Sequence, residues 1–156
     1  GCFVAEITER DLDDLFPVIA LLEGRAAHEA TRKAVAADIA ALDVLHQRLQ
    51  QFASEGLIAD YYEANYAIHE AFITLADNRW LAQVIGDLRK ILRLARAQTL
   101  HVPGRLQQSL AEHLAVFAAL KARDCDAAEE AMRNHLLRQR DALRDVARNQ
   151  QSRLTP

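Results

Sequence analysis

Three histidines lie in the apolar stripes of three different predicted helices. His69 stands in NYAIHEAF, His113 in SLAEHLAVF and His135 in EAMRNHLL. A buried imidazole needs a hydrogen-bond partner or a metal ion, because an unpaired polar group in the interior costs about 1–3 kcal/mol. Asn65 precedes His69 by four residues and therefore projects from the same helical face. These four side chains offer three nitrogen ligands and one oxygen ligand, a set that suits a transition metal.

The spacing of His113 and His135 predicts that their rings lie side by side. The two residues are 22 positions apart, and Asp124, at the centre of a predicted turn, lies eleven positions from each. An antiparallel helical hairpin with that turn brings them to the same level. His69 and Asn65 belong to a third helix, which spacing alone does not place. The remaining histidines fall near helix ends or among polar neighbours, which predicts surface positions for His28, His46 and His101.

The donor set also predicts the kind of ion and the kind of ligand. Imidazole nitrogens suit zinc, nickel, copper or iron(II) rather than magnesium or calcium. We therefore expect a divalent transition metal and favour zinc or nickel. A di-iron bundle would place a glutamate three residues before a histidine, and none of the six histidines has one. Neutral ligands leave the charge of the ion uncompensated, so an open position would attract a small carboxylate. The arginines predicted to hold that carboxylate, unless they form a solvated face, are Arg89, Arg93 and Arg96.

The elements that must position these residues are all predicted to be helices. The chain is rich in Ala, Leu, Arg and Glu, and it contains only five glycines and three prolines. Pro17 falls in the first turns of the first helix, which predicts an irregular start there. Short connections between the helices imply an antiparallel bundle of six or seven helices in one domain. Periodicity and caps predict helices from near Asp11 and over about Thr31–Phe52, Leu57–Ala76, Arg79–Leu100, Leu106–Ala122 and Cys125–Arg148.

The bulk properties of the 156 residues narrow the function classes. A net charge of −3 does not predict the basic face that a nucleic-acid backbone requires. No apolar run approaches the roughly 20 residues that span a bilayer, and no signal-peptide pattern opens the chain. The two cysteines, Cys2 and Cys125, do not form a disulfide framework. We therefore expect a cytoplasmic protein without a membrane partner.

Several spaced motifs, taken together, resemble one known family. They read NYAIH–EAFITLADN, then AEH, then RDCDAAEEAMRNHL. In this order they are similar to the C-terminal effector-binding domain, called FCD, of FadR-type GntR transcription regulators. The likeness covers nearly the whole chain, and the ordered set is specific where any single motif would be weak.

The resemblance implies an all-helical antiparallel bundle that forms a homodimer and holds a metal in a pocket for a small organic acid. By the same likeness, the metal ligands are Asn65, His69, His113 and His135. The family usually has an aspartate where this chain has Asn65, whose amide keeps an oxygen but carries no charge. The family often carries an arginine shortly before the Leu-Glu pair of its first helix, and VIALLE has none before Leu22–Glu23.

The opening residues, GCFVAE, resemble the end of the wing of a winged helix-turn-helix domain. Residues 1–6 are thus predicted to be the remnant of that wing and of a linker, and residues 7–156 the FCD effector-binding and dimerisation domain. DNA would then be bound only through the absent N-terminal domain.

The predicted function is ligand sensing by a transcription regulator and not catalysis. One alternative is a metal-dependent hydrolase, but the chain shows no evident general base. Glu70 and Glu112 neighbour the histidines in sequence, yet adjacent helical residues point about 100° apart. The other alternative is a plain helical dimerisation module whose histidines are satisfied by hydrogen bonds. Metal analysis of the purified chain separates these classes.

Overall fold

The computed structural model describes residues 7–154, except for the side chains of residues 94, 95, 97, 98 and 150–154. The prediction of an all-α fold is confirmed, because the described residues contain six helices and no strand. None of these helices combines the length and apolar character of a bilayer-spanning segment. The predicted wing remnant at residues 1–6 lies outside the described residues. The helices are α1 (Glu9–Lys33), α2 (Ala36–Glu55), α3 (Ile58–Ala76), α4 (Arg79–Thr99), α5 (Arg105–Lys121) and α6 (Cys125–Leu154).

The first two helices differ from the prediction at their junction. The second helix was expected to begin near Thr31, but α1 continues through that residue to Lys33. The Thr31 hydroxyl donates to the Ala27 carbonyl one turn earlier, at 2.8 Å. Thr31 is therefore a residue within α1 and does not cap α2. The expected irregular start at Pro17 was also wrong. Because α1 begins at Glu9, Pro17 lies within the helix, which is continuous through it.

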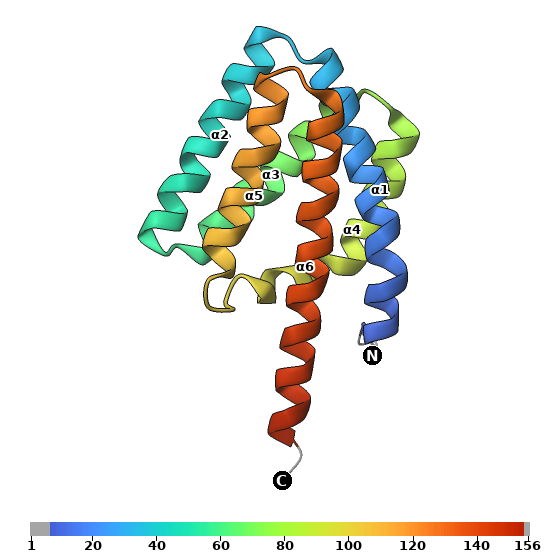
Figure 1. The fold of residues 1–156 in the computed structure, drawn as a ribbon, viewed down its shortest axis with the longest axis vertical. Helices are drawn as coiled ribbons and strands as arrows, with labels where there is room; N and C mark the ends of the chain where they lie inside the picture. The colour runs from blue at the N-terminus through green and yellow to red at the C-terminus, as the bar shows by residue number, and fades with distance from the viewer. Residues whose placement is uncertain (1–6, 155–156) are drawn as a thin grey trace.

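α1 begins and α6 ends at the same end of the molecule, where α6 extends beyond the other helices (Figure 1). α1 packs along α6, α5 and α6 form an antiparallel hairpin, and α3 lies between α1 and α2. The largest apolar cluster joins all helices except α4, with Tyr61, Phe72 and Leu120 fully buried in it. α1 approaches α6 closely at Gly24, where an added Cβ would lie 2.5 Å from Cγ of Arg133 and 3.2 Å from the Glu129 carbonyl oxygen.

Candidate metal centre

Helices α3, α5 and α6 bring His69, His113 and His135 together in the interior. The ring centroids are separated by 5.1 Å for His69 and His113, 5.3 Å for His69 and His135, and 4.5 Å for His113 and His135. One nitrogen from each ring lies within 4.8 Å of the other two. The α5–α6 hairpin turns at Asp124, midway between its two histidines, and places them level as their spacing predicts.

Two of the three rings are oriented by buried carboxylates. Nδ1 of His69 lies 2.5 Å from Oε2 of Glu23, and Nδ1 of His135 lies 2.7 Å from Oε2 of Glu112. A carboxylate accepts the Nδ1 proton, so each ring presents the unprotonated Nε2 to whatever lies in front of it. Among the described residues, no hydrogen-bond partner reaches Nε2 of His113 or Nε2 of His135.

Burial keeps all three imidazoles neutral. It lowers the pKa of His69 to about 3, although the Glu23 carboxylate opposes that change. Burial also lowers the pKa of His135, and it holds the pKa of His113 well below its usual range. Asn65, on the same helix as His69, presents a buried Oδ1 that finds no hydrogen-bond partner in the described part of the chain. Neutral nitrogens from three converging rings fit a bound cation, and Asn65 lines the same small cavity as His69.

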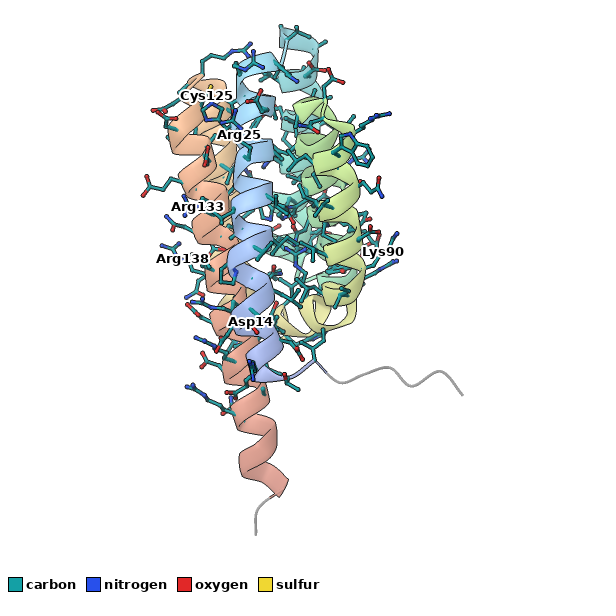
Figure 2. All side chains as sticks on the ribbon, turned by 90° about the vertical axis from the view of Figure 1, so that its right-hand side faces the viewer. Asp14, Arg25, Lys90, Cys125, Arg133 and Arg138 are labelled. Atoms are coloured by element: carbon teal, nitrogen blue, oxygen red, sulfur yellow. The ribbon has the colours of Figure 1, made fainter. Side chains whose placement is uncertain are left out.

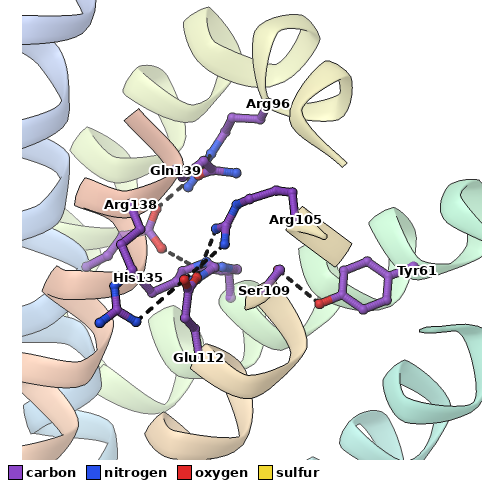
Figure 3. A network of polar contacts seen from close by, with 10 residues as sticks. Tyr61, Arg96, Arg105, Ser109, Glu112, His135, Arg138 and Gln139 are labelled. Atoms are coloured by element: carbon purple, nitrogen blue, oxygen red, sulfur yellow. Dashed lines mark hydrogen bonds and ion pairs between the residues drawn. The ribbon is translucent and has the colours of Figure 1, made fainter. Parts of the chain in front are cut away.

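Glu112 connects His135 to an arginine at the start of α5 (Figure 3). Nη1 and Nη2 of Arg105 each donate to one carboxylate oxygen of Glu112 at 2.9 Å, and both side chains are nearly inaccessible. Arg138 adds a longer contact of 3.7 Å from the surface side. Burial alone would raise the pKa of Glu112, but the hydrogen bonds from His135 and Arg105 hold it below its usual value. Glu112 is therefore an ionised carboxylate that fixes the orientation of His135.

The three predicted effector-binding arginines divide between the interior and the surface. Arg89 and Arg96 are buried, at 6% and 5% exposure, and line a small cavity with Asn65 and His69. The cavity measures about 10 Å³, the room that one water molecule requires. Arg93 is exposed and does not line this cavity, but it lines a surface groove that Arg89 and Tyr66 also line.

The two buried arginines are held by different contacts. Nε of Arg96 donates to Oε1 of Gln139 at 2.7 Å. The guanidinium of Arg89 lies over the ring of Tyr66, 4.6 Å from its centroid. Burial lowers the pKa of Arg96 to about 10, so this guanidinium stays charged at neutral pH.

Glu23 is the site residue that the sequence reading missed. It is 1% exposed, and Arg89 and Arg96 flank it, each with Nη1 3.8 Å from one of its carboxylate oxygens. Burial alone would raise the pKa of Glu23, but His69 and the two arginines hold it well below its usual range. A signal was present in the sequence, since Glu23 follows Ile19 by four residues and thus interrupts the apolar stripe of α1 with a charge.

The predicted surface position of His46 was also wrong. His46 is 1% exposed because it shares the buried face of α2 with Leu42 and Leu49. Its Nδ1 donates to the Leu42 carbonyl at 2.7 Å, and its ring stacks on Phe117 with centroids 4.2 Å apart. Of the other two histidines, His28 is half-buried beside Asp126 and Glu129, and His101 is exposed.

The buried histidines predict how the stability of the metal-free protein depends on pH. Their pKa values are lowered on folding, so the unfolded chain binds protons below about pH 6.5 while the folded chain does not. We expect the free energy of unfolding to fall as the pH is lowered from about 6.5 towards 3, by up to about 1.4 kcal/mol per pH unit for each histidine. Urea titrations in the presence of a chelator measure this slope, and a flat profile between pH 7 and 5 would contradict it.

Comparison with known proteins relates this arrangement to a family. Residues 14–138 match the family model of the FCD domain. The fold is similar to that of a solved structure described as E. coli McbR/YncC, with a TM-score of 0.82 and 21% identity, covering 91% of this chain and 68% of that one. It is also similar to a structure from work on Lar, described as controlling expression of the Listeria monocytogenes agr system and mediating virulence. That TM-score is 0.73 at 11% identity, covering 89% of this chain and 66% of the other. At these identities the two structures show the fold alone. None of the curated proteins compared with the chain matches it.

Proposed function

The chain belongs to the FCD domain family, and we propose that it is the ligand-sensing and dimerisation domain of a GntR-type transcription regulator. In this proposal it binds a divalent transition metal and a small organic acid in the cytoplasm. The acid modulates DNA binding by a separate N-terminal winged helix-turn-helix domain. A ligand shifts the regulator only if it binds two arrangements of the protein unequally.

The observation that carries the metal proposal is the convergence of three neutral imidazoles, two of which have a carboxylate at Nδ1 and two of which have an unpartnered Nε2 among the described residues. His69, His113 and His135 would hold the ion, with Asn65 as an oxygen ligand. Carboxylates that accept the Nδ1 proton of a metal-binding histidine fix its tautomer and strengthen it as a ligand. The bound ion would supply positive charge for an anionic ligand. Zinc and nickel both suit this donor set.

The acid is proposed to bind Arg89 and Arg96 at the cavity beside His69. Both guanidinium groups are buried and charged, and an arginine holds a carboxylate through two parallel hydrogen bonds. The cavity has room for about one water, so an organic acid requires side chains at its edge to move. Tyr66 lines the cavity and is 39% exposed, which makes it a side chain that can yield.

Native mass spectrometry of the chain, purified without a histidine tag, tests the proposal. The expected result is a dimer with about one transition-metal ion per subunit and, where the acid is retained, a further small mass. Less than about a tenth of an equivalent of metal after incubation with zinc or nickel would favour the plain helical module. Turnover of simple esters or amides that disappears with a chelator would instead favour a metal-dependent hydrolase.

Asn65→Asp tests the proposed oxygen ligand. The substitution adds a negative charge beside the ion, so we expect tighter zinc binding and weaker binding of an anion such as malonate. Isothermal titration calorimetry measures both affinities. Asn65→Ala is the matched control, which removes the oxygen and is expected to weaken zinc binding. Unchanged affinities in both variants would show that Asn65 is not a ligand.

The proposed homodimer is supported by exposed apolar side chains on α1 and α4, two helices that lie side by side (Figure 2). Trp80, Val84 and Ile91 follow one another along α4 at helical spacing, with Trp80 62% exposed, and Val18 and Leu21 are exposed on α1. A row of exposed apolar side chains, such as the one along α4, is typical of protein interfaces.

The double substitution Trp80→Asp with Val84→Asp is therefore expected to yield a monomer at concentrations where the wild type is a dimer. It would place four charges in the two-fold interface, two from each subunit. Analytical ultracentrifugation measures the change. Val44→Asp, at an exposed valine of α2, is the control and should remain dimeric. A double variant that stays dimeric places the interface elsewhere.

A further inference from the structure

Two glutamates orient histidines of the triad, which consists of His69, His113 and His135. Only one of these glutamates forms a hydrogen-bonded ion pair with an arginine. Glu112 receives two hydrogen bonds of 2.9 Å from Arg105. The oxygens of Glu23 lie 3.8 Å from Nη1 of Arg89 and 3.8 Å from Nη1 of Arg96. Those distances exceed a hydrogen bond, whose donor and acceptor lie about 2.7–3.2 Å apart. The two arginines therefore surround Glu23 without being satisfied by it.

The spare hydrogen-bonding capacity lies around the cavity. Of the arginines that line the cavity, three buried guanidinium nitrogens have no hydrogen-bond partner among the described residues: Nε and Nη1 of Arg89 and Nη2 of Arg96. Oε1 of Glu23 is likewise buried and without a partner among the described residues. A buried guanidinium normally finds acceptors for its N–H groups. The two arginines therefore have unused donors that could bind a second carboxylate beside Glu23.

Glu23 is not free to leave when such a carboxylate arrives. Its Oε2 stays with Nδ1 of His69, 2.5 Å away. Its backbone is held where α1 crosses α6, at the close approach of Gly24 to Arg133. A carboxylate that binds the two arginines must therefore share them with a negative charge that remains in place. In a dry interior, repulsion between two carboxylates is only weakly screened.

We propose that Glu23 sets the affinity and the charge preference of the acid site by acting as an internal carboxylate that competes for Arg89 and Arg96. The inference rests on the acid site of the proposed function. Glu23 neutralises part of the arginine charge when no acid is bound, and it weakens the binding of any anion that enters. Because the repulsion grows with the charge of the ligand, it opposes a dicarboxylate more than a monocarboxylate.

The matched pair Glu23→Gln and Glu112→Gln tests this competition. Each substitution removes one charge behind a histidine of the triad and keeps an oxygen that can accept its Nδ1 proton, but only Glu23 faces the arginine pair. Malonate and acetate are the probes, titrated by calorimetry into zinc-loaded and metal-free protein. We expect Glu23→Gln to tighten malonate binding about 10-fold or more and acetate binding by a smaller factor in both forms. Glu112→Gln should not tighten the binding of either probe, because the charge that it removes faces Arg105 and not the arginine pair.

The possible outcomes separate this inference from the proposed function. Suppose that malonate binds the wild type. If the two variants then change the malonate affinity alike, or if Glu23→Gln lowers it, Glu23 acts only through His69 and the inference is wrong. If neither probe binds the wild type or a variant, the acid site is wrong and the inference with it. Should circular dichroism show that Glu23→Gln does not fold, Glu23→Asp replaces it. That variant draws the charge away from the arginines and should tighten malonate binding about 3-fold, and unchanged or weaker binding would overturn the inference.

Discussion

Replacing His113 with alanine is expected to lower the zinc affinity of the chain at least about 100-fold. His113 makes the two shorter ring separations of the triad, with centroids 5.1 Å from His69 and 4.5 Å from His135. Loss of a residue that merely orients a ligand costs about 10–100-fold in metal affinity, and loss of the ligand itself costs more. Competition with a chromogenic chelator measures the change.

The same substitution should remove the stabilisation that zinc confers. A ligand present at about 100 times its dissociation constant stabilises the folded state by about 2.7 kcal/mol, so the melting temperature of the wild type should rise with added zinc while that of His113→Ala should not. His101→Ala is the control, because His101 is exposed and lies outside the triad. Equal zinc binding by wild type and His113→Ala would overturn the metal proposal.

Glu112→Leu is expected to cause a large loss of stability. The substitution leaves Arg105 buried at 4% exposure without the carboxylate that receives its two hydrogen bonds, and it removes the acceptor of His135 Nδ1. Removing one partner of a buried ion pair costs about 3–5 kcal/mol, because the other charge remains uncompensated. Urea titrations of the metal-free proteins measure the difference.

The double variant Arg105→Met with Glu112→Leu serves as the control. It removes both charges and replaces them with apolar side chains, a change that is often close to neutral for buried pairs. We expect it to recover more than half of the stability that Glu112→Leu loses. A single variant that loses less than about 1 kcal/mol, or a double variant that recovers nothing, would show that the uncompensated charge is not the cause.

The helices and their order follow from local information in the chain. Glycines, prolines and capping residues such as Asp124 mark the helix ends, and apolar periodicity marks the buried faces. The level placement of His113 and His135 is local as well, because a short turn midway between two residues leaves an antiparallel hairpin little freedom. The junction of α1 and α2 was placed too early because Thr31 can either cap a helix or bond within one.

The limit of periodicity is clearest in the three arginines of α4. On a helical wheel of 100° per residue, Arg93 lies about 40° from Arg89 and about 60° from Arg96, so spacing alone assigns all three to one face. The edge of the buried surface falls between them, and only Arg89 and Arg96 are buried. Where that edge runs depends on how α4 is rotated against the other helices, which no local pattern specifies.

By itself, the sequence determined which residues lie on helices and which histidines interrupt apolar stripes, because these are properties of one segment at a time. Only the tertiary structure decided that Glu23 of α1 meets His69 of α3 and the arginines of α4, and that His46 lies inside. Those contacts join residues far apart in the chain. They depend on the rotation and crossing of whole helices, which are set by the packing of all six together.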